Sequence, residues 1–347
     1  MSGAALRVQG LGFGYAGGEA LLCDVDLDLE AGSVGCLLGA SGVGKSTLLR
    51  LIAGLDRPDR GSISLGGETL FGPGRPGVPV HRRHIGMLLQ DGALFPHLDV
   101  AGNVGFAIPR GPDRDARIGA WLERVGLRHL AGAHTASLSG GERARIALVR
   151  ALASEPRLLL LDEPFAALDT DLRRQLAQDI LALLRPLGVT VLMVTHDWAE
   201  ALSLADRLGV MIGGSLPQWS TPQALYEAPA SIEVARRIPG TGFLRTERGP
   251  DGAWRCAVGT LPAAAVECVG EVGAAGLLLV RSELLGWSDS GSARIVSRSY
   301  LGGAYRYRIE LASGEALQMS ERTRRPVGAA VGLHPAPGGS WRCYPAD

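Results

Sequence analysis

The sequence predicts an α/β fold built on a mainly parallel sheet, followed by a smaller all-β domain. Up to about residue 238, apolar strand-like runs alternate with helical patterns, which is typical of a parallel sheet with right-handed helical crossovers. Beyond Ile238-Pro239-Gly240 the chain changes to short alternating stretches broken by glycine and proline. We therefore expect two domains, residues 1–238 and residues 239–347, which suits a chain of 347 residues.

The first element that carries chemistry is a glycine-rich turn. The apolar run SVGCLL precedes it and a leucine-rich helical pattern follows, as the pattern G-x-x-x-x-G-K-[ST] requires for a phosphate-binding loop. Glycines let successive N–H groups point into one concavity, and the helix N-terminus adds partial positive charge. The residues expected to contact a nucleotide are Gly39, Ala40, Ser41, Gly42, Val43, Gly44, Lys45, Ser46 and Thr47. Lys45 would reach the outer phosphates and Ser46 would ligate Mg²⁺; a glycine-rich turn without a ligand is the alternative.

A second glycine pair begins the stretch LSGGERARIALVRAL. Ser139, Gly140 and Gly141 again offer backbone N–H groups before an apolar helical pattern. This second anion cradle has no lysine of its own. It is explained if it closes on the phosphates of a nucleotide that another subunit binds.

The next strand, RLLLLDEP, is a nearly continuous apolar run, as in buried parallel strands. Asp162 at its carboxyl end would hold Mg²⁺, and Glu163 would polarise the attacking water. The alternative is an acidic pair on the surface. A helical pattern follows, and then the strand VTVLMVTH places His196 at another carboxyl end, where ligand sites of open α/β sheets gather.

Beyond residue 238 the stretch AYRYRIEL alternates apolar and charged residues. Tyr305, Tyr307 and Ile309 share one face, which predicts a half-buried strand of an antiparallel sheet or small barrel.

Bulk composition excludes several classes of protein. Lys+Arg and Asp+Glu both number 35, so no long-range attraction to nucleic acid is expected. No apolar run approaches the roughly 18 residues of a membrane span, and the N-terminus lacks the apolar core of a signal peptide. The five cysteines are scattered without a C-x-x-C pair, which favours reduced thiols in a cytosolic protein, with a metal or redox role as the alternative.

In this order the motifs resemble those of ABC transporter ATPase subunits. The Walker A motif corresponds to residues 39–47, the Q-loop to Gln90, the signature to residues 138–142, the D-loop AALD to residues 166–169 and the switch histidine to His196. Walker B ends at the acidic pair already described. The resemblance covers the whole length, more loosely after residue 240. It implies a P-loop ATPase domain whose mostly helical subdomain spans about residues 91–156, and an ATP + H₂O to ADP + phosphate reaction.

The same resemblance implies further site residues and partners. Tyr15 would stack on adenine, although an exposed loop tyrosine is the alternative. Gln90 would act at the γ-phosphate and the metal, and Asp169 would contribute to the nucleotide site. Two copies would form a head-to-tail homodimer with two ATP molecules between Walker A and signature. The signature reads LSGGE where LSGGQ is the commonest form, so Glu142 is a departure.

The tail and several loops indicate a subfamily. VRSELLGW (residues 280–287) is similar to the VRPE turn of a TOBE-type OB domain, with Ser282 replacing proline. Loop segments 71–88, 90–108 and 228–244 look most like ferric-iron importer ATPases. The resemblance thus implies a peripheral subunit on the cytoplasmic face of the inner membrane, bound to a permease and served indirectly by an external substrate-binding protein. In ALFPHL, Leu94, Phe95 and Leu98 would lie near the permease, or pack internally.

Two alternatives remain open at this stage. The substrate could be molybdate, sulfate, polyamine or sugar instead of iron. A soluble ABC ATPase without a transport role is the alternative from another class. The short spacing between Walker A and Walker B, with no heptad run, and the single cassette argue against DNA-repair and ribosomal members.

Overall fold

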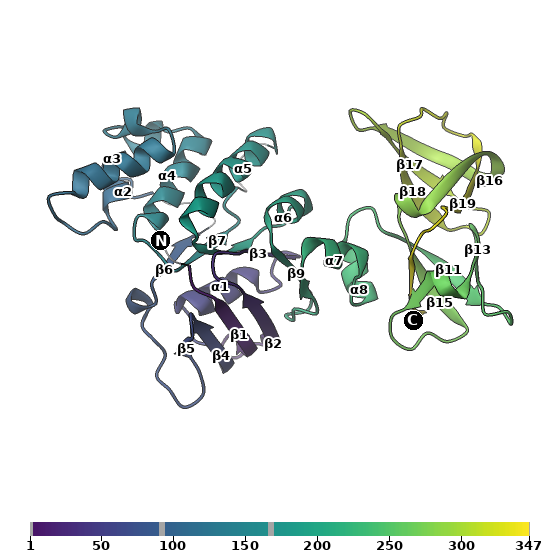
Figure 1. Cartoon of the computed structure of the whole chain (residues 1–347), viewed down its shortest axis with the longest axis horizontal. Coiled ribbons are helices and arrows are strands. Elements are labelled where there is room, and N and C mark those ends of the chain that lie inside the picture. Colours follow the sequence, from purple (N-terminus) through teal and green to yellow (C-terminus); the bar gives the residue numbers. More distant parts are fainter. Residues whose placement is uncertain (1–2, 90–93, 166–169, 347) are drawn as a thin grey trace. The chain divides into compact units, whose positions relative to one another are not determined.

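The computed structural model describes residues 3–89, 94–165 and 170–346 (Figure 1). The chain divides into two compact units, Met1–Leu225 and Tyr226–Asp347. The first contains helices and strands in alternation and the second consists mainly of strands, so the predicted fold class is confirmed. In the described part of the chain, no helix has the length and apolar character needed to cross a bilayer.

A six-stranded sheet in the order β10-β9-β3-β8-β7-β6 lies at the centre of the first unit. The β3–β8, β3–β9, β7–β8 and β6–β7 pairs are parallel, and β10 pairs antiparallel with β9. The carboxyl ends of β3, β7 and β8 therefore meet at one edge. The strands are β3 (Val34–Gly39), β6 (Ile85–Leu88), β7 (Leu158–Asp162), β8 (Thr190–Val194), β9 (Arg207–Met211) and β10 (Trp219–Ser220).

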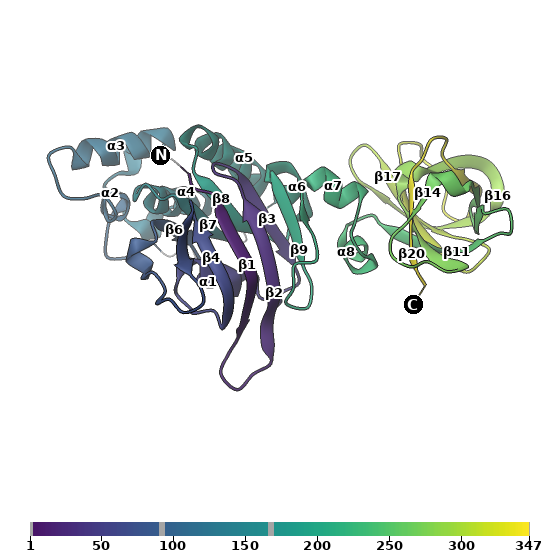
Figure 2. The same ribbon diagram turned by 60° about the horizontal axis from the view of Figure 1, so that its bottom comes forward.

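A second, antiparallel sheet of the first unit has the strand order β2-β1-β4-β5. It contains β1 (Leu6–Gly14), β2 (Ala20–Leu29), β4 (Arg60–Leu65) and β5 (Glu68–Phe71), and β1 and β2 are its long strands (Figure 2). Helix α1 (Lys45–Ala53) shares one apolar core with strands of both sheets. This packing fixes the start of α1, and with it the glycine-rich turn, against β3.

The remaining helices connect the parallel strands. Helix α5 (Thr170–Leu187) lies between β7 and β8 in the chain, and α6 (Trp198–Leu204) between β8 and β9. Between residue 94 and Pro156 the described chain forms α2 (Val100–Gly105), α3 (Arg114–Arg124) and α4 (Gly140–Leu152), with the short turns η2 (Arg128–Leu130) and η3 (Thr135–Ser137). A further turn, η1 (Val80–Arg82), precedes β6.

Three apolar residues expected near a permease lie at the start of this helical segment. Leu94 is buried, which matches internal packing, whereas Phe95 and Leu98 are half-buried. The Phe95 ring lies 4.5 Å from the ring of Phe106, which is itself 65 % exposed.

The second unit contains two sheets, in the orders β13-β12-β11-β15-β20-β14 and β18-β17-β16-β19. Their inner faces share one core that includes Trp254, Tyr307 and Trp341. In β17 (Tyr305–Glu310), buried and exposed residues alternate, as the AYRYRIEL pattern predicts. The other strands are β11 (Gly242–Arg248), β12 (Trp254–Cys256), β13 (Gly259–Leu261), β14 (Val266–Cys268), β15 (Ala275–Val280), β16 (Leu285–Tyr300), β18 (Ala316–Glu321), β19 (Ala330–Pro335) and β20 (Trp341–Pro345), with turns η4 (Ala263–Ala265) and η5 (Ser282–Leu284).

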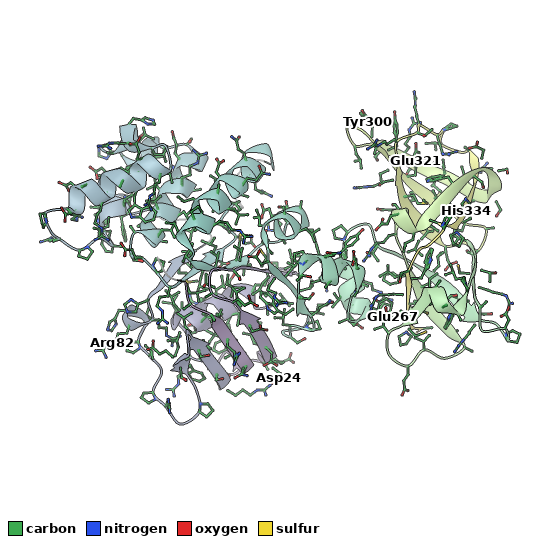
Figure 3. The ribbon with its side chains drawn as sticks, in the orientation of Figure 1. Asp24, Arg82, Glu267, Tyr300, Glu321 and His334 are labelled. Atoms are coloured by element: carbon green, nitrogen blue, oxygen red, sulfur yellow. The ribbon has the colours of Figure 1, made fainter. Side chains whose placement is uncertain are left out.

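Each unit has charged side chains on its surface. Asp24 and Arg82 are exposed on the first unit, and Glu267 on the second (Figure 3). Tyr300, at the tip between β16 and β17, is also exposed.

The division between the units falls earlier than the change in composition after residue 238. Helix α7 (Pro222–Glu227) spans the division, and α8 (Ile232–Arg237) belongs to the second unit. Ile232 packs in a cluster with Leu279 and Tyr344, and the Tyr344 hydroxyl donates to the Pro229 carbonyl at 3.0 Å. The Arg281 guanidinium lies over a tyrosine ring of α7 at 3.8 Å. These contacts pack residues 226–237 against the strands of the second unit, although the composition of the chain changes only after residue 238.

Candidate functional site

Three strand ends position the candidate site. Leu37 of β3 and Asp162 of β7 both align with Val194 of β8, so the segments that follow these strands are neighbours. They surround a cavity of about 480 Å³. Its lining residues are Leu21, Gly39, Ser41, Gly42, Gly44, Lys45, Ser46, Thr47, Glu163 and His196.

The glycine-rich turn has the backbone conformation that its sequence predicts. Gly42 and Gly44 have φ values of 79° and 104°, in the left-handed region that favours glycine. A Cβ atom on Gly44 would lie 2.5 Å from the side chain of Leu22. Gly44 is also the N-cap of α1 and has no side chain to cap it, so the first amides of the helix remain suited to a phosphate.

Lys45 projects across the turn. Its Nζ donates to the carbonyl oxygens of Gly39 at 3.0 Å and Ala40 at 2.9 Å. The residue is 6 % exposed, and this burial lowers the pKa of its ammonium group, while the nearby Glu163 and Asp162 carboxylates oppose the shift. A buried cation beside free amides favours an anionic ligand.

Ser46 and Asp162 meet although they come from distant parts of the chain. The Ser46 Oγ donates to Asp162 Oδ1 at 2.8 Å. Burial raises the pKa of Asp162, and the Ser46 hydrogen bond lowers it in part. A hydroxyl and a carboxylate are hard oxygen donors of the kind Mg²⁺ takes beside phosphates, so these two residues fit the predicted metal site.

Glu163 and His196 form the other wall of the cavity. Glu163 has a φ of 46°, and its N–H donates to the Val194 carbonyl at 3.0 Å. This left-handed conformation costs energy for a residue other than glycine, and such strain is common at functional sites. The turn places Glu163 Oε2 at 3.3 Å from His196 Nδ1.

Several residues predicted to bind the nucleotide do not line this cavity. Ala40 and Val43 belong to the turn but do not line the cavity. Tyr15 is 55 % exposed, stacks edge-on against Phe13 at 4.9 Å, and lines a separate cavity of about 320 Å³. Gln90 and Asp169 lie outside the described residues.

The residues of the predicted signature, 138–142, do not line this candidate cavity of their own chain. Ser139 is the N-cap of α4, and its N–H and Oγ both donate to Glu142 Oε2 at 2.8 Å. In return the Glu142 N–H donates to Ser139 Oγ at 3.3 Å. The two hydrogen bonds that Ser139 donates lower the pKa of the Glu142 carboxyl group. Gly140 and Gly141 form the first turn of the helix.

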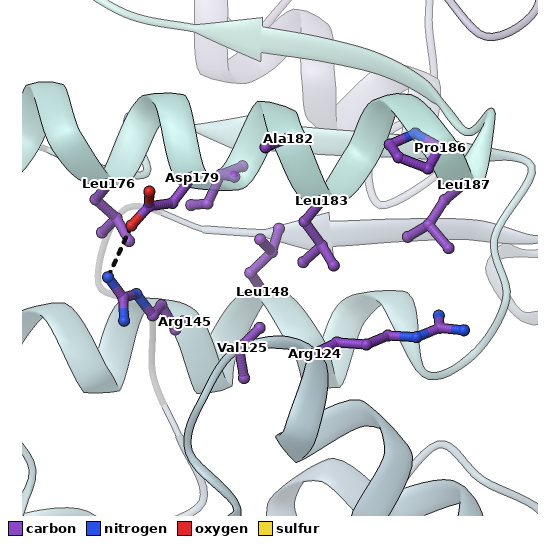
Figure 4. A pocket seen from close by; sticks show the side chains of 11 residues that line it. Arg124, Val125, Arg145, Leu148, Leu176, Asp179, Ala182, Leu183, Pro186 and Leu187 are labelled. Atoms are coloured by element: carbon purple, nitrogen blue, oxygen red, sulfur yellow. Dashed lines mark hydrogen bonds and ion pairs between the residues drawn. The ribbon is translucent and has the colours of Figure 1, made fainter.

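A larger cavity of about 590 Å³ lies between α4 and α5 (Figure 4). Its walls are mainly apolar and carry one ion pair, Arg145 to Asp179 at 2.9 Å. It lacks the glycine-rich turn and the acidic pair that line the candidate site. The lining residues are Arg124, Val125, Arg145, Leu148, Leu176, Asp179, Ile180, Ala182, Leu183, Pro186 and Leu187.

Two polar residues near the site do not stand out in the sequence. Arg173 on α5 and Glu200 on α6 line a small cavity together with Glu163 and His196. Glu200 lies on α6, whereas His196 precedes that helix and its N-cap Asp197, so no local sequence signal relates the two residues.

Models of known families match both units. A model described as ABC transporter matches residues 22–166, and a TOBE domain model matches residues 278–341. The predicted presence of a TOBE-type domain in the second unit is therefore confirmed.

Relatives match most of the chain. A protein of Rhodococcus jostii is 40 % identical over 331 residues, covering 94 % of this chain and 93 % of the relative. One of Serratia marcescens is 40 % identical over 340 residues, covering 95 % and 97 %. One of Mesorhizobium japonicum is 48 % identical over 232 residues, covering 66 % and 64 %. All three are named Fe(3+) ions import ATP-binding protein.

A solved structure agrees with these relatives. It is a cbiO1 protein from Clostridium perfringens, described as part of an ABC transporter complex. It is 30 % identical and has a TM-score of 0.59, covering 67 % of this chain and 93 % of its own. With the Walker-type turn, the acidic strand end and the matched families on one molecule, the chain belongs to the ATP-binding proteins of ABC transporters, which hydrolyse ATP.

Proposed function

We propose that this chain is the ATP-hydrolysing subunit of an import complex that carries ferric iron into the cell. The observation that carries the proposal is the match to Fe(3+) import ATP-binding proteins over more than nine-tenths of their length. A complex of this kind would place the subunit against a permease at the cytoplasmic face of the membrane, with an external binding protein delivering the substrate. The half-exposed Phe95–Phe106 pair suits such a docking surface.

The proposed binding step uses the glycine-rich turn. Backbone amides of the turn and of the α1 N-terminus would bind the phosphates, and Lys45 would leave its two carbonyl partners for the outer phosphate oxygens. Ser46 and Asp162 would hold Mg²⁺, which neutralises phosphate charge when bound. Tyr15 is proposed to cover the adenine ring from its exposed position.

The proposed hydrolysis step uses the pair opposite this turn. The Glu163 carboxylate would orient and polarise the attacking water, and His196 would fix the carboxylate and contact the terminal phosphate. Gln90 and Asp169 are proposed to complete the site. Positioning and electrostatic stabilisation account for most of the catalysis in phosphoryl transfer, so side-chain placement matters more here than covalent chemistry.

The signature supports a proposed homodimer. Ser139, Gly140 and Gly141 lie away from the cavity of their own chain. They can contact a nucleotide only if the cavity belongs to a second copy. Each of two sites would then combine the Walker turn of one copy with the signature of the other.

Uptake of labelled Fe³⁺ tests the substrate. Deleting the chain should abolish iron uptake delivered by the binding protein, and the parent chain should restore it while Glu163→Gln should not. Uptake of molybdate, sulfate and sugar serves as the comparison. If the deletion removes one of these and leaves iron uptake intact, the importer role stands and the iron assignment is wrong.

A further inference from the structure

The turn that carries His196 is held by a buried hydrogen-bond network. Thr195 Oγ1 donates to Glu200 Oε2 at 2.6 Å, and the Asp197 N–H donates to Thr195 Oγ1 at 3.0 Å. Thr195 is 3 % exposed and Glu200 is 6 % exposed. One buried hydroxyl group therefore fixes the residues on both sides of His196.

Arg173 connects this turn to the segment that follows β7. Its Nε donates to the Phe165 carbonyl at 3.2 Å. Its guanidinium also lies 3.8 Å from Glu200 Oε1 and 3.9 Å from Asp197 Oδ2. A single side chain thus contacts both segments that carry the proposed hydrolytic residues.

The network contains a charge whose removal from water is costly. Burial raises the pKa of Glu200, and Asp197 raises it further, whereas the Thr195 hydrogen bond, Arg173 and His196 favour the charged form. A buried carboxylate that loses a hydrogen-bond donor keeps its full desolvation penalty. Loss of the Thr195 hydroxyl should therefore shift the turn and not leave it in place.

We propose that Thr195, Glu200 and Arg173 are positioning residues that hold His196 against Glu163. The His196 side chain is 56 % exposed, so its place is set by its backbone turn more than by packing of the ring. All five residues line one small cavity. The proposal rests on the hydrolytic roles proposed above, and a misplacement of about 1 Å at such a site can cost on the order of a hundredfold in rate.

The test compares Thr195→Val with Thr195→Ser. Valine matches threonine in shape and removes the hydroxyl, so kcat for ATP hydrolysis should fall about tenfold or more. KM and the Kd for a fluorescent ATP analogue should change by less than about twofold, because the phosphate-binding turn is untouched. Serine restores the donor, and Thr195→Ser should recover kcat to within about threefold of the parent.

Thr190→Val is the matched control. Thr190 lies at the other end of β8, is fully buried, and its hydroxyl donates to the Ala4 carbonyl at 2.9 Å and accepts from the Gly32 N–H at 3.0 Å. The control loses the same kind of buried hydroxyl. It should lower the Tm while kcat stays within about twofold of the parent.

The outcomes separate this inference from the proposed function. If Thr195→Val hydrolyses ATP like the parent, or no worse than Thr190→Val, the positioning role is wrong. If Thr195→Val does not fold, Glu200→Gln decides, because it keeps an acceptor and removes the charge that faces Arg173. A kcat at least about threefold lower with unchanged KM supports the role, and a parental kcat overturns it. If Glu163→Gln loses hydrolysis while Thr195→Val and Glu200→Gln hydrolyse ATP at the parent rate, the positioning role is wrong and the proposed function stands.

Discussion

Replacing Glu163 by glutamine keeps the shape of the side chain and removes its ability to accept a proton. The carboxylate lines the nucleotide cavity and lies 3.3 Å from His196, so it is placed to act on a water beside the phosphates. A well-placed general base contributes roughly 10²–10⁴ in rate. We expect Glu163→Gln to lower hydrolysis by about 10²–10³, or about 3–4 kcal/mol at 1.36 kcal/mol per tenfold.

Stability and nucleotide binding should change little in this variant. The Glu163 and His196 side chains are 22 % and 56 % exposed, and at such exposure even a full ion pair contributes only about 0–1 kcal/mol. No hydrogen bond of the phosphate turn involves Glu163 among the described contacts. ATP should therefore still bind, and the uncleaved nucleotide should hold two copies together.

Three measurements test these expectations. Single-turnover phosphate release reports hydrolysis, binding of a fluorescent ATP analogue reports nucleotide affinity, and light scattering with ATP reports whether two copies stay together. Glu155→Gln is the matched control, because Glu155 is also a glutamate with a left-handed φ, 54°, and an ion pair, 2.7 Å to Arg117, outside the nucleotide cavity. The control should hydrolyse ATP like the parent. A folded Glu163→Gln that releases phosphate within about threefold of the parent rate would remove Glu163 from this role.

Three further expectations concern the same site. Gly44→Ala should lower the Tm and weaken ATP binding, because φ is 104° and the new Cβ would contact a leucine at 2.5 Å; Gly67→Ala, with φ of 83° and open space, isolates the backbone strain. Asp162→Asn should raise the Tm at neutral pH and abolish hydrolysis. Burial raises the pKa of Asp162, so the parent loses stability when this carboxyl group becomes charged, as the pH rises through the ordinary aspartate pKa of about 3.9. The higher Tm of Asp162→Asn should therefore disappear at pH values below about 3.9. Mixing Lys45→Ala with Ser139→Ala subunits should recover part of the ATPase activity if the site is shared between copies; heterodimers without any recovery would contradict the shared site unless both sites must act together.

The features that the sequence predicts correctly are those in which all the residues of the pattern are close together in the chain. The run before the glycine turn, the turn itself and the helix after it lie within one segment, so local rules determine them. Ser46 and Asp162 also lie in contact as expected, because Asp162 ends β7, Ser46 lies in the helix that follows β3, and the carboxyl ends of parallel strands share one edge of a sheet. Residue type and strand order are sufficient for that contact.

Contacts between side chains on different helices were not predictable in the same way. Arg173 and Glu200 lie on α5 and α6, and their approach depends on how both helices pack on the sheet. Ser139 and Glu142 are different, since S-x-x-E before an apolar run is a capping-box pattern. Glu142 caps α4 in this way, and because a capping box takes either glutamate or glutamine at this position, the departure from LSGGQ keeps the cap.

The position of the signature is the physical reason for proposing a second copy. The register of β3, β7 and β8 brings the glycine-rich turn, the Ser46–Asp162 pair and the Glu163–His196 pair to one edge of one sheet. Helix α4 begins at Gly140 after its N-cap Ser139, and neither Ser139 nor the first residues of the helix line the cavity at that edge. The cavity of one chain is thus lined by the glycine-rich turn and by Glu163, the candidate base. The glycine pair after Ser139, which could also bind an anion, does not line it. Ser139, Gly140 and Gly141 do not line the cavity of their own chain. Because amides at the start of a helix bind phosphate, a nucleotide bound by a second copy is the ligand that fits them.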